Sequence, residues 1–362
     1  MAKNMPKYLE LVNWIRKQIE DGELSPGEKL YSENELSDMF SLSRQTVRHA
    51  ISVLEQEGVL NRVQGSGTYI NEPRSKRPDT GRIAVIMTYT DGYIFPRTIR
   101  AIEDKLFKAG YLVQLAVTNN LISREGAILE TILEQDDVEG IIVETVKSAL
   151  PNPNLHLYQE LLARQIPVLF INSYYPELSA PHVSMDDRLT GRLVTEYLLK
   201  KGHKKIAGVF KLDDGQGHLR YAGFLEALEA AGIACDESKI IWVDTEDTKD
   251  FEKLREKVRC RTRGCTGLVC YNDEIAFGLL KILKEEGIRV PEDLSIVSVD
   301  NTDLAVLGDV MLTSMPYPME KLGECAAEKL MKMIKNSVFD GNYEFPMQIV
   351  ERDSVKDLNK NK

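Results

Sequence analysis

The amino-acid sequence predicts an N-terminal winged helix-turn-helix of the α+β class, linked to an α/β domain of two lobes built on two parallel sheets. The first part of the prediction rests on residues 7–70. Apolar residues at helical spacing are followed there by a tight turn, another helix and a glycine-rich hairpin. The second part comes from residue 82 onward, where short apolar runs alternate with amphipathic helices, as in βαβ units. A break near residues 182–187 divides these runs into two series, each of which predicts one lobe. The expected division of the chain is 1–71 for the winged helix, 72–81 for a linker and 82–362 for the α/β domain.

The composition is that of an ordinary soluble protein, with 43% hydrophobic and 28% charged residues in a chain of 362. Residues 1–78 hold 11 basic and 11 acidic side chains, so the whole net charge of −10 lies beyond residue 78. We expect the acidic part to face away from any nucleic acid that the N-terminal part binds. The sequence contains no signal peptide and no apolar run of about 18 residues, which predicts a cytoplasmic protein without a membrane partner. The five cysteines fit reduced thiols, and their spacing argues against a metal site.

Three helices are predicted in the N-terminal part. The first covers residues 7–21, where apolar residues recur on one face until a glycine ends the pattern. Ser32 with Glu35 forms a capping box that opens a second, short helix. A turn follows, and Ser43 is a favourable N-cap for the third helix.

The third helix has the two faces expected of a helix that reads the major groove of DNA. Its apolar stripe consists of Val47, Ala50, Ile51 and Leu54. The opposite face carries Gln45 and Arg48, with Arg44 at its edge; arginine can bond guanine and glutamine can bond adenine through two hydrogen bonds each. The hydroxyls of Ser43 and Thr46, at the helix N-terminus, suit phosphate oxygens. Taken alone, such a helix could equally be a solvated face, but the ordered set of capping box, turn, helix and hairpin favours DNA binding.

A hairpin forms the predicted wing. Residues 59–60 and 68–70 are expected to pair across a tip at residues 65–67, after Gly58 ends the third helix. This places Arg62 beside the backbone or minor groove of bound DNA. The full set of residues predicted to contact DNA is Lys7, Ser43, Arg44, Gln45, Thr46, Arg48, Arg62, Gln64, Gly65 and Ser66.

These segments resemble the GntR family of bacterial transcriptional regulators. The family motifs stand here as Leu30-Tyr31-Ser32-Glu33-Asn34-Glu35-Leu36, Ser43-Arg44-Gln45-Thr46-Val47-Arg48, Leu54-Glu55-Gln56-Glu57-Gly58-Val59-Leu60 and Gly65-Ser66-Gly67-Thr68-Tyr69-Ile70. Two positions depart from the pattern: Tyr31 replaces a proline, and Asn34-Glu35 stands where many members carry a basic residue. The resemblance implies a DNA-binding winged helix whose operator contacts differ in detail from those of its relatives.

Eight apolar runs predict the strands of the α/β domain, over residues 83–88, 111–117, 140–145, 166–172, 205–210, 239–243, 267–271 and 294–299. Ligands of such sheets bind at the carboxyl ends of the strands, so the residues that follow each run are the candidates for function. These residues combine aromatic rings with carboxylates, amides, lysine and arginine. Rings cover the C–H face of a sugar, and planar polar groups bond its hydroxyls. The sequence therefore predicts a sugar site between the lobes.

Two alternatives are left open by the residues themselves. A strand-end acid such as Asp187 or Asp273 could simply cap the helix that follows. A sugar-processing enzyme would need a general base or a metal, and an exported binding protein would need a signal sequence. Because no Ser-His-Asp set, metal motif or phosphate loop is visible, we expect neither enzymatic activity nor a cofactor.

The large domain resembles the effector domain of the LacI/GalR repressors and the periplasmic sugar-binding proteins, over about residues 82–355. The motifs that carry the resemblance are residues 198–203, 220–224, 270–276 and 290–300. A GntR-type reader joined to such a domain resembles the arabinose repressors of Gram-positive bacteria. The resemblance to LacI-type domains implies effector contacts at Phe95, Asp187, Arg220, Asn272 and Asp300, and that to the arabinose repressors implies Glu144 and Lys147. With the strand-end residues, the predicted effector set is Tyr89, Tyr93, Phe95, Glu144, Lys147, Asn172, Asp187, Arg220, Asn272 and Asp300.

Together the resemblances imply a repressor of sugar utilisation genes. We expect a homodimer that reads near-palindromic operator DNA and releases it when L-arabinose enters the cleft. Another pentose, a hexose or a nucleoside is the alternative effector, because sugar epimers differ by a single hydroxyl.

Overall fold

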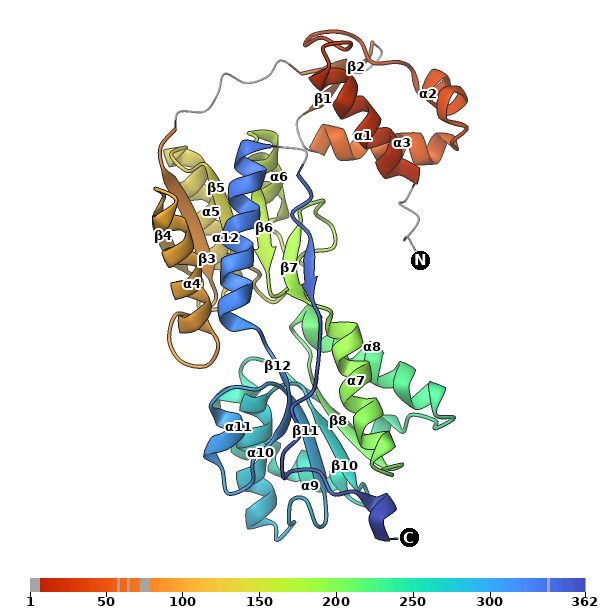
Figure 1. The fold of residues 1–362 in the computed structure, drawn as a ribbon, viewed down its shortest axis with the longest axis vertical. Coiled ribbons are helices and arrows are strands. Elements are labelled where there is room, and N and C mark those ends of the chain that lie inside the picture. Colours follow the sequence, from red (N-terminus) through yellow and green to blue (C-terminus); the bar gives the residue numbers. More distant parts are fainter. Residues whose placement is uncertain (1–6, 57–58, 64–65, 72–78, 337–338, 362) are drawn as a thin grey trace.

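The computed structural model describes residues 7–56, 59–63, 66–71, 79–336 and 339–361. Figure 1 shows a small N-terminal domain and, below it, two stacked lobes. We call the upper of these the N-lobe and the lower the C-lobe.

The N-terminal domain is a winged helix with α1 (Lys7–Glu20), α2 (Glu33–Phe40), α3 (Arg44–Gln56), β1 (Leu60–Val63) and β2 (Gly67–Ile70). The predicted capping box is present, because the Glu35 amide donates to Ser32 Oγ and the Ser32 amide donates to the Glu35 carboxylate. The predicted stripe of α3 is fully buried against α1 and α2. The two wing strands pair antiparallel, as expected. Gly58, which was predicted to end the third helix, lies outside the described residues.

The N-lobe is built on a six-stranded parallel sheet in the order β13-β7-β6-β5-β3-β4. Its strands are β3 (Arg82–Met87), β4 (Leu112–Val117), β5 (Gly140–Glu144), β6 (Val168–Ile171), β7 (His182–Met185) and β13 (Tyr343–Phe345). Its helices are α4 (Phe95–Lys108), α5 (Ile122–Gln135), α6 (Leu155–Ala163) and α12 (Met319–Lys335). The helices α4 and α12 pack together on one face, and α5 and α6 cover the other (Figure 1).

The C-lobe is built on a five-stranded parallel sheet in the order β12-β11-β10-β8-β9. Its strands are β8 (Ile206–Lys211), β9 (Ile240–Val243), β10 (Gly267–Cys270), β11 (Ser295–Asp300) and β12 (Thr313–Pro316). Its helices are α7 (Asp187–Lys200), α8 (Gly215–Ala230), α9 (Arg255–Thr262), α10 (Asp273–Glu285) and α11 (Leu304–Leu307). Four 3₁₀ turns complete the elements, at Glu237–Lys239, Asp247–Lys249, Phe251–Leu254 and Leu358–Asn361.

All eight predicted strands are present, but β7, β12 and β13 were missed. The missed strand β12 is mostly buried although its residues include Thr313 and Ser314. Their hydroxyls are satisfied, since Ser314 Oγ donates to Asp273 and Thr313 Oγ1 donates to the Arg352 carbonyl. The sequence also predicted that each lobe is formed by one continuous stretch of the chain, and this was wrong. After β12 the chain returns to the N-lobe, where it forms α12 and β13.

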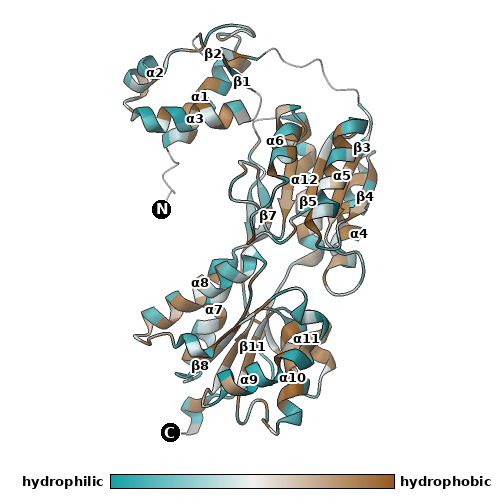
Figure 2. Cartoon of the chain, turned by 180° about the vertical axis from the view of Figure 1, so that it is seen from behind, coloured by the Kyte–Doolittle hydropathy of each residue, from teal (hydrophilic) through white to brown (hydrophobic). Residues whose placement is uncertain are grey.

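Apolar residues concentrate in the sheets and in the helix faces that cover them, whereas the outer surfaces are hydrophilic (Figure 2). The strands β5, β6, β10 and β11 are buried along their whole length, as expected for a parallel sheet covered on both faces. Within the described part of the chain, no helix is long and apolar enough to cross a membrane.

Candidate functional site

The exposed surface of α3 presents the residues predicted to read DNA. Arg44, Gln45 and Arg48 are all exposed. The Thr46 amide donates to Ser43 Oγ at 3.2 Å, and the two hydroxyls lie 2.8 Å apart. Ser43 therefore caps α3 as predicted, and both hydroxyls stay at the helix N-terminus, where a phosphate oxygen would be bound favourably.

Glu33 connects the recognition helix with the wing. Its Oε2 lies 2.7 Å from Arg48 Nε, and its Oε1 lies 2.8 Å from Arg62 Nη2. Both arginines are more than half exposed, so the two ion pairs are screened by water and weak. Sequence reasoning missed this contact, because Glu33 precedes Arg48 by 15 residues and Arg62 by 29. Glu33 engages only Nε of Arg48, and the two terminal nitrogens of Arg48 have no hydrogen-bond partner among the described residues.

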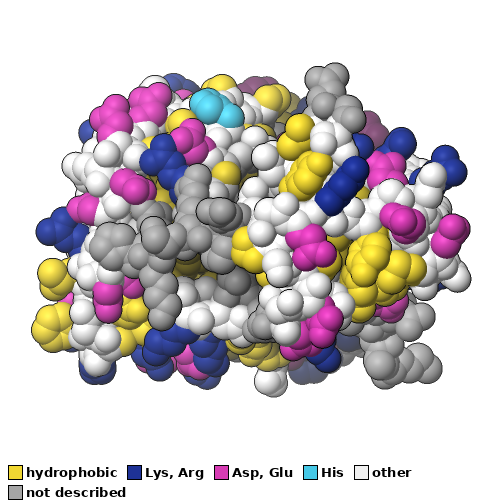
Figure 3. Space-filling view, turned by 90° about the horizontal axis from the view of Figure 1, so that it is seen from above, with side chains coloured by type: hydrophobic (Ala, Val, Ile, Leu, Met, Phe, Trp, Pro, Cys, Tyr) yellow, Lys and Arg dark blue, Asp and Glu magenta, His cyan; other side chains and the backbone are white. Residues whose placement is uncertain are grey.

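Two further residues of the predicted DNA set, Lys7 and Ser66, are also exposed. Lys7 is the first residue of α1 and is exposed. Ser66 is exposed on the wing, with its hydroxyl 2.5 Å from that of Tyr69. Gln64 and Gly65 lie outside the described residues. Seen from above, the surface of the molecule carries basic and acidic side chains interspersed (Figure 3).

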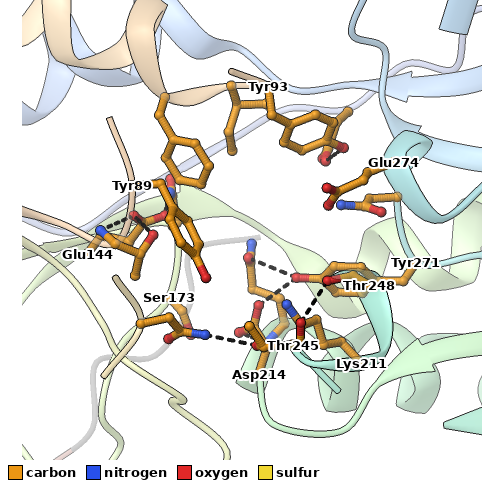
Figure 4. Close-up of a pocket in the computed structure, with 18 of the residues that line it drawn as sticks. Tyr89, Tyr93, Glu144, Ser173, Lys211, Asp214, Thr245, Thr248, Tyr271 and Glu274 are labelled. Atoms are coloured by element: carbon orange, nitrogen blue, oxygen red, sulfur yellow. Dashed lines mark hydrogen bonds between the residues drawn. The ribbon is translucent and has the colours of Figure 1, made fainter. Parts of the chain in front are cut away.

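A cavity of about 470 Å³ lies between the lobes, at the carboxyl ends of strands from both sheets (Figure 4). Most of the predicted effector residues line it, namely Tyr89, Tyr93, Phe95, Glu144, Lys147, Asn172, Arg220, Asn272 and Asp300. Asp187 differs from the expectation: it does not line this cavity but lies behind Arg220. The cap of α7 is Asp186, whose side chain accepts from the Leu189 amide.

Arg220 is the centre of the C-lobe side of the cavity. Its Nε donates to Asp187 at 2.8 Å and its Nη1 donates to the Tyr271 carbonyl at 2.6 Å. Asp300 lies 3.9 Å from Nη2, and the guanidinium stands 4.5 Å from the centre of the Tyr271 ring. Burial raises the pKa of Asp187 to about 6 and that of Asp300 to about 7, although the positive charge of Arg220 opposes both shifts. The buried guanidinium of Arg220 thus lies between the carboxyl groups of Asp187 and Asp300.

Glu144 is the corresponding acid on the N-lobe side. It is buried and accepts hydrogen bonds from the amide and hydroxyl of Thr88 and from the side-chain amide of Asn172. Burial raises the pKa of Glu144, and these hydrogen bonds lower it. Asn172 in turn accepts a hydrogen bond from the Tyr317 hydroxyl, so the Asn172 side chain is fixed between Glu144 and Tyr317. The rings of Tyr89 and Phe95 meet edge to face at 5.5 Å beside this group.

The lobes already touch across the cavity. The Tyr93 hydroxyl donates to Asp300, and Asn120 Nδ2 donates to Thr245 Oγ1 at 2.9 Å. A third contact joins Ser148 Oγ to Asp214 at 3.1 Å. The cavity is therefore bounded by both lobes rather than opened by their separation.

Several polar residues that line the cavity were absent from the predicted set, among them Thr88, Asp213, Asp214, Thr245, Tyr271 and Tyr317. Thr88 and Tyr271 directly follow β3 and β10, so the strand-end rule could have found both. Tyr317 follows β12, a strand that was not predicted because its hydroxyl residues do not form an apolar run. Asn272 both caps α10 and lines the cavity, whereas the buried Asp273 bonds Ser298, Ser314 and Thr302 instead. No group of three or more metal-ligating side chains is present in the part of the chain that the structure describes.

Comparison with protein families identifies both domains. Residues 7–70 match the gntR family of bacterial regulatory proteins, and residues 195–355 match a periplasmic binding protein-like domain. An arabinose metabolism transcriptional repressor of Geobacillus stearothermophilus is 39% identical over 98% of this chain and 99% of its own length. The protein of the same name from Halalkalibacterium halodurans is also 39% identical, over 95% of this chain and 93% of its own.

Solved structures show the same fold. The transcription regulator CcpA of Lactococcus lactis is 28% identical and superposes with a TM-score of 0.69, covering 76% of this chain and 99% of its own. A complex of the transcriptional regulator CelR with cellobiose is 22% identical, with a TM-score of 0.66 over 86% of this chain and 90% of its own.

Proposed function

Because the chain belongs to the family of the arabinose metabolism transcriptional repressors, we propose that it represses transcription from operator DNA and releases that DNA when L-arabinose binds between its lobes. The observation that carries the proposal is the Arg220 cluster with Glu144 across the cavity. These groups offer a guanidinium, carboxyl groups and amides to the hydroxyls of one ring. Tyr89 and Phe95 offer faces for its C–H bonds. No cofactor or catalytic step is part of the proposal.

The charges around the cavity favour a neutral sugar over a sugar phosphate. Arg220 is already paired with Asp187 and lies near Asp300, so no free guanidinium is available for a phosphate. The cavity lining also contains more carboxyl groups than cationic groups. A phosphorylated pentose would bring additional negative charge into this surrounding and bind less well.

We infer that the protein acts as a cytoplasmic homodimer whose two winged helices read the halves of a near-palindromic operator. Sugar binding would alter the relative position of the lobes and thereby the spacing of the two DNA-binding helices. The coupling must be reciprocal: a sugar that weakens operator binding by some factor is itself bound more weakly, by the same factor, when DNA is present.

The proposal is tested by measuring operator affinity with and without sugar at constant salt. The full chain is used to select an operator from random duplexes, and fluorescence anisotropy then gives the dissociation constant. We expect saturating L-arabinose to weaken binding by roughly 5–150-fold, the usual range of allosteric coupling. D-xylose, D-ribose and D-arabinose serve as epimeric controls. Unchanged affinity in L-arabinose would refute the assigned effector, and a response to another pentose would replace it.

A matched pair of variants distinguishes the role of the cavity arginine from the general effect of removing one positive charge. Arg220→Gln removes the buried guanidinium at the cavity and should abolish the response to sugar. Arg188→Gln removes an exposed arginine that pairs with Glu226 outside the cavity, and the response should persist. An undiminished response in Arg220→Gln would contradict the assigned site.

A further inference from the structure

Asp300 has a backbone conformation that residues with a Cβ atom rarely adopt. Its φ is 98°, and that of the following Asn301 is 47°. Two consecutive non-glycine residues with positive φ are strained, and such strain persists only where the surrounding structure imposes it. The conformation matters for the site, because Asp300 lines the cavity and the direction of its side chain follows from its backbone.

One buried carboxylate, that of Asp273, binds the chain on both sides of Asp300. Its Oδ1 accepts a hydrogen bond from the hydroxyl of Ser298, two residues before Asp300. Its Oδ2 accepts from the amide of Thr302 at 2.7 Å and from the Thr302 hydroxyl at 3.2 Å, two residues after Asp300. Asp273 and Ser298 are fully buried, so water does not compete for these bonds and they are strong.

Ser314 on the neighbouring strand β12 ties the same turn to Asp273. Its Oγ donates to Asp273 Oδ1 at 2.7 Å and accepts from the Asn301 amide at 3.0 Å. The Tyr317 amide donates to the Asp300 carbonyl at 3.0 Å. The strained turn is thus bound at each of its residues, and most of these bonds converge on the Asp273 carboxylate.

Asp273 itself has no contact with the cavity. It does not line it, and the cap of α10 is Asn272 rather than Asp273. Asp300 does line the cavity, where it accepts from the Tyr93 hydroxyl of the N-lobe and lies 3.9 Å from Arg220 Nη2. An effect of Asp273 on a bound sugar must therefore pass through Asp300.

We propose that Asp273 is a positioning residue of the sugar site, which holds the strained turn at Asp300 so that the Asp300 carboxyl group meets both the sugar and Tyr93. The proposal rests on the proposed function, because it takes Asp300 as a contact of the bound sugar. Simple support of the C-lobe core is the alternative role, and it predicts lost stability without a specific loss of sugar affinity.

The experiment measures the affinity of the full chain for L-arabinose by titration calorimetry. Asp273→Asn keeps the shape of the side chain but replaces one acceptor oxygen with a donor, so part of the bonding to the turn is lost. We expect the affinity for L-arabinose to fall by about tenfold, the value of one hydrogen bond to a charged group. Unchanged affinity in a folded Asp273→Asn would refute the positioning role and leave the proposed function intact. If the unmodified chain does not bind L-arabinose, both proposals fail.

Ser354→Ala is the matched control for general loosening of the C-lobe. Ser354 is also fully buried, and its Oγ donates to the Ile296 carbonyl at 2.6 Å and accepts from the Thr313 amide at 2.8 Å. These bonds join the same two strands, β11 and β12, but near their amino ends. The melting temperature should fall, whereas the affinity for L-arabinose should stay within about twofold. A loss of affinity as large as that of Asp273→Asn would overturn the proposal.

A double-mutant cycle shows whether Asp273 acts through Asp300. Once Asp300→Ala has removed the positioned carboxyl group, adding Asp273→Asn should weaken sugar binding by less than about twofold more. Additive losses would show that Asp273 acts elsewhere and would overturn the assignment. Ser314→Ala removes one tie of the same turn and should weaken L-arabinose in the same direction. If Asp273→Asn does not fold, Ser314→Ala replaces it in the cycle, with the same outcomes.

Discussion

Arg220 and Asp187 form an ion pair between α8 and α7, with Nε and Oδ1 2.8 Å apart and side chains only 4% and 3% exposed. Asp187 does not reach the cavity itself. It holds the guanidinium in place from behind, because a buried charge without its partner is strongly unfavourable. The pair therefore links the packing of two helices to the geometry of the cavity.

Removal of Asp187 should destabilise the protein and weaken sugar binding together. Asp187→Ala leaves Arg220 buried without its main partner, and we expect a loss of about 3–5 kcal/mol in the free energy of unfolding. Urea denaturation measures this loss. Glu226→Ala breaks the exposed pair with Arg188 and should cost about 1 kcal/mol or less. Equal losses in the two variants would show that burial of the Asp187 pair has no special effect.

Arg48 should contribute to operator recognition rather than to general DNA affinity. We expect Arg48→Ala to weaken operator binding by about 1–3 kcal/mol, the value of a good two-bond contact to a base. Anisotropy titrations on operator and on random duplex at the same salt distinguish the two roles. An equal loss on both duplexes would assign Arg48 to a phosphate.

Glu33 should restrain DNA binding, because it occupies Arg48 and Arg62 in the free protein. Glu33→Gln removes a carboxylate that competes with phosphates, so affinity for both operator and random DNA should increase. The magnitude of the salt slope should increase by about one, as expected for one more neutralised phosphate. Asp38→Asn removes a neighbouring exposed acid of α2 and controls for the change in net charge. Identical behaviour of the two variants would argue against the specific contact.

The free energy of unfolding should decrease as the pH rises, because Asp300 has a raised pKa in the folded protein. Its pKa in the folded protein is about 7 because of burial, compared with an ordinary value of 3.8. A carboxyl with a raised pKa binds its proton more tightly in the folded state. Its contribution to the free energy of unfolding is therefore complete below about pH 4 and is lost as the pH rises through about 7.

Asp300→Asn cannot titrate and isolates this effect. Between about pH 5 and pH 8 the unmodified chain should lose stability relative to Asp300→Asn, which urea denaturation at stepped pH will follow. Parallel stability curves for the two proteins would contradict the assignment.

The packing of α7 on α8 should depend on two glycines. A Cβ on Gly191 would lie 2.0 Å from the Arg220 carbonyl oxygen, and one on Gly223 would lie 1.9 Å from the Arg188 carbonyl oxygen. We expect Gly191→Ala to cost about 1–3 kcal/mol by overpacking and to weaken sugar binding through the displaced Arg220. Gly308→Ala, where the nearest atom is 3.5 Å away, should stay within about 0.5 kcal/mol. A neutral Gly191→Ala in thermal and urea unfolding would show that the helices can separate freely.

Local patterns predicted most of the elements correctly. The capping box at Ser32 and Glu35 and the cap at Ser43 involve residues three apart, so the sequence displays both partners. The eight apolar runs are strands, and most are buried because both faces of a parallel sheet are covered, whereas the edge strand β4 has no buried residue. The same reasoning failed for β12, where buried hydroxyls satisfied by distant partners replace apolar side chains.

The sequence by itself thus determined the winged helix, the strand-and-helix alternation and the residue types available at the strand ends, because these depend on short-range periodicity and capping. Only the tertiary structure decided that Tyr93 meets Asp300 across 207 residues, that Glu33 joins Arg48 to Arg62, and that Asp187 supports Arg220 from behind. It also decided that one buried oxygen of Asp213 has no hydrogen-bond partner among the described residues. These relationships arise when sheet order and helix packing bring distant segments together, and no local pattern in the chain records which polar groups will then find partners.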